Sequence, residues 1–217
     1  LKASECFVYG DRTAGQEWPH LLIERNLTNQ TNPSPFTKIS DKEKIVVSVT
    51  SRLNYFEDKM TVPANESLHS AMMMLYLYVS HRNPETKTFD DMIWLGVMIF
   101  DNRWEYSHQM DFVDSGSKGS ATEKYIYNLG GEDFLSSGNN FWKKGQIVSG
   151  YDSPWVKATV DVLPYISTAL ERAQLSDCMI GCDYENLYIS GMYIGYELPG
   201  TYDIEMSFKD VDIRVFW

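Results

Sequence analysis

Apolar residues recur at every second position over much of this 217-residue sequence, and this alternation restricts the fold more than any other feature. Successive side chains of a β-strand point to opposite faces of a sheet, so an alternating segment buries one face and leaves the other in water. In residues 44–56, one face carries Ile45, Val47, Val49, Leu53 and Tyr55. We therefore expect this segment to be a half-buried strand.

Four further segments are expected to be strands because they alternate or are rich in β-branched and aromatic residues: 122–128, 155–162, 186–198 and 202–216. The turn sequence Leu198-Pro199-Gly200-Thr201 separates the last two segments. Proline presets φ and glycine permits a positive φ, so this turn predicts an antiparallel hairpin.

One segment has helical spacing instead. After Pro164, which suits the first turn of a helix, the apolar residues are Ile166, Ala169, Leu170 and Ala173. Strands at regular spacing with one short helix predict an all-β fold, an antiparallel β-sandwich of jelly-roll type. No linker divides the sequence, so we expect a single domain over residues 1–217.

Two segments, 72–79 and 92–100, are apolar on both faces of the strands that they would form. One face of each is aliphatic and suits a core. The other face carries aromatic residues, methionines and one glycine: Met72, Met74, Tyr76, Tyr78, Met92, Trp94, Gly96, Met98 and Phe100. Central strands with both faces covered would explain this composition, and a ligand-binding surface on a concave sheet would explain it equally well.

In the ligand-binding interpretation, Trp94, Tyr76 and Tyr78 stack against the apolar faces of sugar rings, and Gly96 leaves room for the ligand. Arg52 and Asn54 on a neighbouring strand would bind hydroxyl groups. Further contacts would come from loop residues: Asn102, Trp104 and Trp142.

The strand series and the closing stretch 188–209, YISGMYIGYELPGTYDIEMSFK, resemble the β-jelly-roll carbohydrate-binding modules and the related concanavalin-like sandwiches. The resemblance implies a protein that binds neutral glycans outside the cell and often carries a structural calcium. It leads us to expect a non-catalytic, lectin-like module, secreted or at the cell surface, that belongs to a larger secreted protein. Oxygen ligands for calcium would come from aspartates near strand ends: Asp90, Asp91, Asp101, Asp111, Asp114, Asp210 and Asp212.

Two alternatives stay open. A polysaccharide-degrading enzyme, a lyase or glycoside hydrolase, would use Arg103, Tyr106 and His108, which follow one strand directly. A glycoside hydrolase requires two carboxylates, for which Glu197 and Glu205 are candidates if their strands pair. The third possibility is a structural sandwich in which the methionine- and aromatic-rich face is a protein interface.

Composition limits the partners. A net charge of −11 and a pI near 4.8 disfavour nucleic acid and anionic membranes. No apolar run approaches the ~20 residues of a membrane-spanning helix, and no leader opens the sequence, so we expect any signal peptide to have been removed. Cys178 and Cys182 lack a nearby histidine or a second cysteine pair, which argues against a zinc site. The pairing of Cys6, Cys178 and Cys182 stays open.

Overall fold

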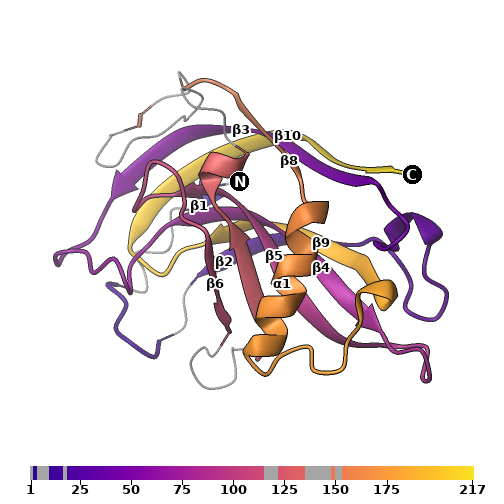
Figure 1. Cartoon of the computed structure of the whole chain (residues 1–217). Helices are drawn as coiled ribbons and strands as arrows, with labels where there is room; N and C mark the ends of the chain where they lie inside the picture. Colours follow the sequence, from indigo (N-terminus) through magenta and orange to yellow (C-terminus); the bar gives the residue numbers. More distant parts are fainter. Residues whose placement is uncertain (1, 4–9, 17–18, 115–121, 135–147, 150–152) are drawn as a thin grey trace.

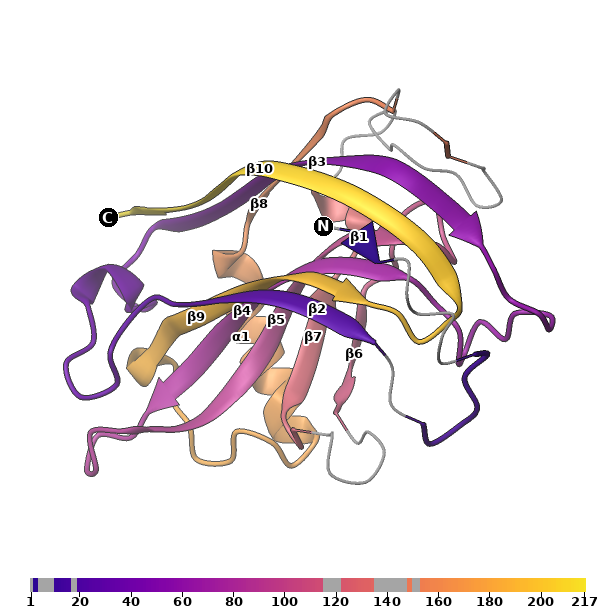
Figure 2. The same ribbon diagram turned by 180° about the vertical axis from the view of Figure 1, so that it is seen from behind.

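The computed structural model describes residues 2–3, 10–16, 19–114, 122–134, 148–149 and 153–217. Within these ranges the strands form two sheets that pack on each other (Figure 1, Figure 2). The four-stranded sheet has the order β1 (Lys2–Ala3), β10 (Tyr202–Phe216), β3 (Lys44–Asp58) and β8 (Val156–Asp161). The six-stranded sheet has the order β2 (His20–Asn26), β9 (Leu187–Glu197), β4 (Met72–Arg82), β5 (Phe89–Asp101), β7 (Tyr125–Leu129) and β6 (Met110–Val113).

The expected all-β sandwich of jelly-roll type is confirmed. Its longest pairing joins β3 and β10, which run side by side as a curved pair along one side of the molecule (Figure 2). All pairings between the named strands are antiparallel except that of β5 with β7. After β5 the chain forms β6 at the edge of the sheet and then turns back as β7, which lies between β5 and β6. Strand β7 is therefore antiparallel to β6 and parallel to β5.

The predicted hairpin of the last two strands is wrong. β9 pairs with β2 and β4 in one sheet, whereas β10 pairs with β1 and β3 in the other. The turn between them is buried and crosses from sheet to sheet, held by hydrogen bonds from the Leu198 amide to the Pro19 carbonyl and from the Gly200 amide to the Ser70 carbonyl. The turn chemistry is local, but the partners of each strand are set by the whole sheet.

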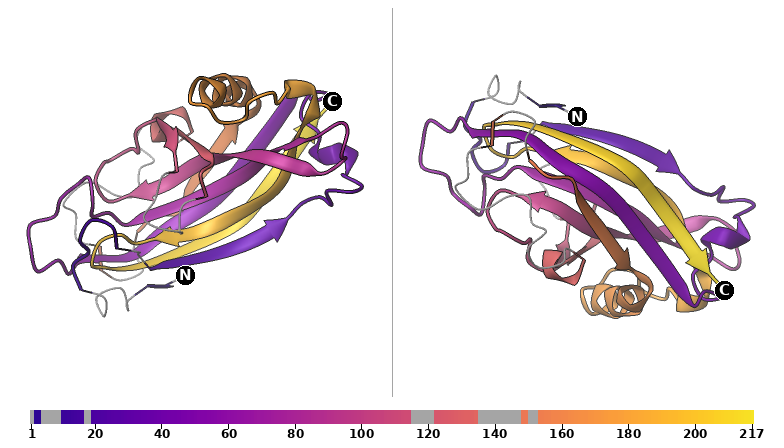
Figure 3. Two further views of the ribbon diagram at one scale, coloured as in Figure 1. Left: turned by 90° about the horizontal axis from the view of Figure 1, so that it is seen from below. Right: turned by 90° about the horizontal axis from the view of Figure 1, so that it is seen from above.

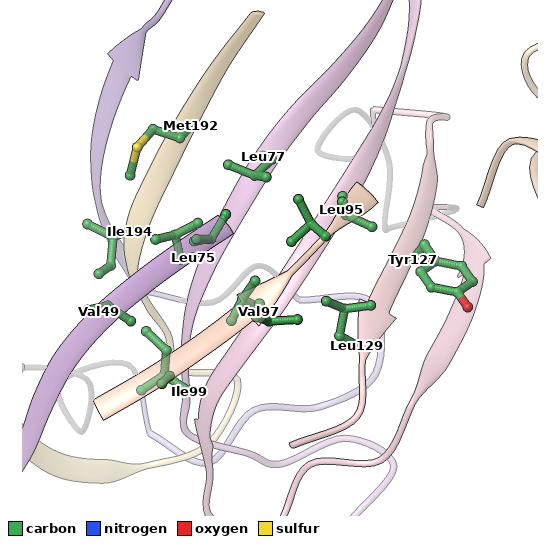
Figure 4. Close-up of a cluster of buried hydrophobic side chains, with 14 of the residues drawn as sticks. Val49, Leu75, Leu77, Leu95, Val97, Ile99, Tyr127, Leu129, Met192 and Ile194 are labelled. Carbon is green, nitrogen blue, oxygen red and sulfur yellow. The ribbon is translucent and has the colours of Figure 1, made fainter. Parts of the chain in front are cut away.

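The main core lies between the two sheets. Figure 4 shows part of it, with side chains from β3, β4, β5, β7 and β9: Val49, Leu75, Leu77, Leu95, Val97, Ile99, Tyr127, Leu129, Met192 and Ile194. The aliphatic faces of β4 and β5 are therefore core, as their sequences predict. Burying each such side chain contributes about 1.5–3 kcal/mol to stability.

Helix α1 (Leu163–Leu175) closes the side of the sandwich, where it contacts β5 of one sheet and β3 of the other (Figure 3). Its buried face is the predicted one: Ile166, Ala169, Leu170 and Ala173. The short 3-10 helices are η2 (Pro35–Thr37), η3 (Gly131–Asp133) and η4 (Tyr184–Asn186). None of the helices in the described ranges has both the length and the apolar character needed to span a membrane.

Candidate functional site

The six-stranded sheet has a second apolar cluster on its outer face, away from the main core. Strand register places its aromatic rings together: Tyr78 lies opposite Trp94 on β5, and Tyr76 lies opposite Tyr193 on β9. We call Tyr76, Tyr78, Trp94 and Tyr193 the aromatic cluster. Strands β4 and β5 are apolar on both faces because one face belongs to the main core and the other to this cluster.

The rings of the aromatic cluster pack mostly edge to face. The ring centroids lie 4.6 Å apart for Tyr78 and Trp94, 5.5 Å for Trp94 and Tyr193, and 5.1 Å for Tyr76 and Tyr193. Tyr76 and Tyr193 are 5% and 7% exposed, whereas Tyr78 and Trp94 are half-buried. Two of the four rings are therefore covered, and only Tyr78 and Trp94 have substantial surface to offer a ligand.

Gly96 lies beside this cluster, between Tyr76 on β4 and Asn128 on β7. The Tyr76 hydroxyl donates a 2.6 Å hydrogen bond to Asn128 Oδ1. A Cβ at position 96 would lie 2.1 Å from that oxygen and 2.7 Å from Cε1 of Tyr76. The space beside Gly96 is filled by this hydrogen-bonded pair, so the prediction that it accommodates a ligand is wrong.

Carboxylates surround the aromatic cluster, and we call Glu24, Asp114 and Glu197 the acidic rim. Glu24 projects from edge strand β2 and accepts a 2.7 Å hydrogen bond from the Tyr78 hydroxyl. Asp114 directly follows β6, and its Oδ2 accepts hydrogen bonds from the amide and hydroxyl of Thr122, at 3.0 and 2.8 Å. The Thr122 hydroxyl in turn accepts a 3.1 Å hydrogen bond from Nε1 of Trp94, which links the rim to the aromatic cluster.

Glu197 is the last residue of β9 and is half-buried, with its Oε1 3.5 Å from the Tyr193 hydroxyl. The pKa of this carboxyl is raised to about 7, mainly by burial and further by the negative charge of Asp114, against the opposing effect of the Tyr193 hydroxyl. Asp114 influences Glu197 although β6 lies at the far edge of the sheet from β9. The charge of Asp114 therefore acts on Glu197 across the outer face of the sheet, where Thr122 links Asp114 to Trp94.

This raised pKa predicts that the free energy of unfolding decreases as the pH rises from about 4.5 to about 7. In that window the folded protein keeps the Glu197 proton and the unfolded chain has lost it, so each added pH unit favours unfolding. The pKa difference corresponds to at most about 3 kcal/mol. Urea denaturation at pH 4.5 and pH 7.5 measures this change. In the Glu197→Gln variant, the part of this change in unfolding free energy that comes from Glu197 should be absent. An identical pH dependence in both proteins would contradict the assignment.

The other residues predicted to bind a ligand lie elsewhere. Arg52 and Asn54 are on β3 in the four-stranded sheet, where Arg52 Nε donates a 2.8 Å hydrogen bond to Asn54 Oδ1. Asn54 is buried and donates to Glu205 Oε1 and Ser207 Oγ, at 3.0 and 2.8 Å. The guanidinium of Arg52 lies 4.8 Å from the ring centroid of Trp155. The structure does not bring these two residues to the aromatic cluster.

The turn after β5 collects most of the predicted catalytic residues. Arg103 pairs with the buried carboxylate of Asp101, with Nε and Nη2 at 2.9 and 2.6 Å, and its guanidinium lies over the Trp104 ring. His108 stacks on Trp104 with ring centroids 4.7 Å apart. Asn102 Oδ1 accepts a 2.7 Å hydrogen bond from the Ala71 amide.

These contacts tie the turn to itself and to the strands beneath it. Tyr106 is half-buried and packs against the main core, whereas His108 is exposed. Trp142 lies outside the described residues. Glu197 and Glu205 belong to different sheets, so the carboxylate pair considered from the sequence does not form.

Sequence reasoning missed two site residues, Glu24 and Tyr193, and it named Asp114 only as a possible calcium ligand. Tyr193 and Glu197 are an even number of positions apart on one strand, so alternation alone places them on the same face. Strand β2 gives no such signal, because nearly all of its residues are exposed at the sheet edge. Asp114 is linked to Trp94 through Thr122, and residue spacing does not encode this contact.

Comparison with solved structures finds similar chains at 9–12% sequence identity. No protein-family profile and no curated protein sequence matches it. Similar solved structures include an endo-1,4-β-glucanase, the cellulase CelB2 (9% identity, 99% of this chain and 80% of that chain, TM-score 0.45). Others are the endoglucanase Cel12A from Rhodothermus marinus (9%, 95% and 78%, TM-score 0.45) and the family 11 xylanase from Neocallimastix patriciarum (12%, 94% and 78%, TM-score 0.42).

The expectation of a non-catalytic glycan-binding module is corrected by the geometry of the aromatic cluster. An open row of rings was expected, but Tyr76 and Tyr193 are covered and the rings pack against one another. Carboxylates surround the cluster, and the pKa of one of them, Glu197, is strongly raised.

Proposed function

We propose that the aromatic cluster and the acidic rim form the active site of a glycoside hydrolase that acts on a neutral polysaccharide, with Glu197 as the general acid. The observation that carries this proposal is the position of Glu197, half-buried beside Tyr193 and within the electrostatic influence of a second carboxylate, Asp114. A net charge of −11 disfavours anionic polysaccharides, so the substrate is expected to be neutral.

Glycoside hydrolysis requires one carboxyl that is protonated near neutral pH and a second that is ionised. Glu197 fits the first role because burial and Asp114 raise its pKa to about 7, so it can donate a proton to the glycosidic oxygen. Asp114 fits the second role, since Thr122 hydrogen bonds fix its orientation. It would act as the nucleophile or as the base that activates water, according to its distance from Glu197.

The aromatic cluster supplies the contact with the sugar. Tyr78 and Trp94 retain exposed ring surface on the side of the sheet that carries both carboxyls. The apolar C–H face of a pyranose ring suits such a surface. Tyr76 and Tyr193 lie beneath and hold the exposed rings in place through edge-to-face contacts. Hydrolysis of a polysaccharide agrees with the extracellular location expected for this protein.

Release of reducing ends from a panel of neutral β-glucans, xylans and mannans tests the proposal. Asp114→Asn should reduce the rate on any substrate that the wild type cleaves by ~100-fold or more, as expected for loss of a base or nucleophile. Glu205→Gln is the matched control: it removes a carboxylate that lies on the other sheet and bonds to Asn54, and the rate should stay within a few-fold. Absence of cleavage on the whole panel, or equal loss in both variants, would refute the assignment.

A further inference from the structure

A second group of chemically reactive side chains lies near the other end of β4 and β5, apart from the aromatic cluster. His81 stands near the end of β4, and Asp90 stands near the start of β5. Cys182 and Asp183 lie between α1 and η4. His81, Asp90 and Cys182 each have an atom that could bind a metal, and these three atoms lie within 4.8 Å of one another. Three segments that are distant in the sequence therefore meet here.

The His81 side chain is only 5% exposed, yet just one of its ring nitrogens has a hydrogen-bond partner among the described residues. Nδ1 lies 2.8 Å from Asp90 Oδ1 and donates to it. In the neutral tautomer that carries its proton on Nδ1, the lone pair is on Nε2 and can bind a metal. Nε2 lies 3.6 Å from Asp183 Oδ2, too far for a good hydrogen bond. A buried acceptor without a donor is unfavourable, and a bound cation would remove that cost.

We infer that His81, Cys182 and Asp183 bind a zinc ion, with Nε2 of His81 facing the metal and Asp90 orienting the imidazole. An imidazole nitrogen, a thiolate sulfur and a carboxylate oxygen together suit zinc, whereas calcium takes oxygen ligands. A carboxylate on the far nitrogen of a zinc-binding histidine is a common outer-shell arrangement. Asp90 was expected to serve calcium, and this site gives it a different role.

Cys182 supplies the sulfur ligand of the proposed site. It is buried close to His81, and it and its neighbour Cys178 are both free of disulfide bonds. Zinc binds cysteine as the thiolate, so the thiol proton passes to the solvent as the Zn–S bond forms.

Isothermal titration of the metal-free protein with zinc chloride under reducing conditions tests the inference. The wild type should bind one zinc ion per chain and melt at a higher temperature with zinc than without it. Cys182→Ser should weaken binding by ~100-fold or more, and Asp90→Asn by ~10–100-fold. Cys178→Ser is the matched control, because it removes the neighbouring thiol, which does not belong to the proposed site, and should bind like the wild type.

A second readout does not depend on how well the variants fold. Cobalt(II) added to the wild type in place of zinc should produce a thiolate-to-metal charge-transfer band, since cysteine sulfur is a ligand. Saturable binding with that band supports the site. Absence of one-to-one zinc binding by the wild type would overturn it, and so would unchanged affinity in Cys182→Ser or a missing cobalt–thiolate band.

Discussion

Replacing Glu197 by glutamine is expected to lower the rate of polysaccharide hydrolysis by ~10²–10⁴-fold, the usual contribution of a general acid. Glutamine has nearly the same shape as glutamic acid but cannot give a proton to the leaving oxygen. The residue is already held mostly in its neutral form below pH 7, because burial and Asp114 raise its pKa to about 7. The substitution therefore changes the chemistry of the site much more than its packing or charge.

The pH dependence of the hydrolysis rate is a second test of Glu197 as the general acid. Wild-type activity should fall as the pH rises through about 7, because the proton that Glu197 donates is lost there. Initial rates from pH 5 to pH 9 on one soluble substrate measure this limb. Glu205→Gln serves as control, since that carboxylate lies on the other sheet and bonds to Asn54. A Glu197→Gln enzyme that keeps wild-type activity would show that another group supplies the proton.

Much of the sandwich could be predicted from the sequence, because the alternation of apolar and polar residues within one strand shows which of its side chains are buried. Residues 44–56 fall within β3, and the four apolar residues of α1 are all buried. The edge strands β2 and β6 were missed, since their side chains are largely exposed or half-buried and their apolar pattern is weak. The hairpin prediction failed at Leu198–Thr201, because a turn sequence does not specify whether the chain stays in its sheet.

The site was predictable only in part. Alternation correctly places Tyr76, Tyr78 and Trp94 on one face, but whether that face is open depends on Tyr193, which comes from a strand over a hundred residues later. The pKa of Glu197 depends on burial and on the charge of Asp114, which belongs to a distant part of the sequence. His81 and Cys182 likewise meet only in the folded chain. Properties that arise from long-range approach leave no spacing pattern in the sequence.

The Gly96→Ala variant is expected to be destabilised by about 3 kcal/mol, although alanine is ordinarily the better residue within a strand. The new Cβ would lie 2.1 Å from Asn128 Oδ1 and 2.7 Å from the Tyr76 ring, and both side chains are buried. Overpacking of this kind costs ~1–3 kcal/mol. Displacing Asn128 also breaks its hydrogen bond with the Tyr76 hydroxyl and leaves buried polar groups unpaired, at a further ~1–3 kcal/mol.

Gly191→Ala provides the comparison, because Gly191 lies on the same face and its Cβ would approach Tyr78 at 2.8 Å. Tyr78 is half-buried and can move outward, so this variant should lose less stability than Gly96→Ala. Urea denaturation of the wild type and both variants measures the difference. Equal stability of Gly96→Ala and the wild type would mean that the Tyr76–Asn128 pair can move without cost. The packing of the aromatic cluster would then be adaptable, because the Tyr76 ring contacts the rings of both Trp94 and Tyr193.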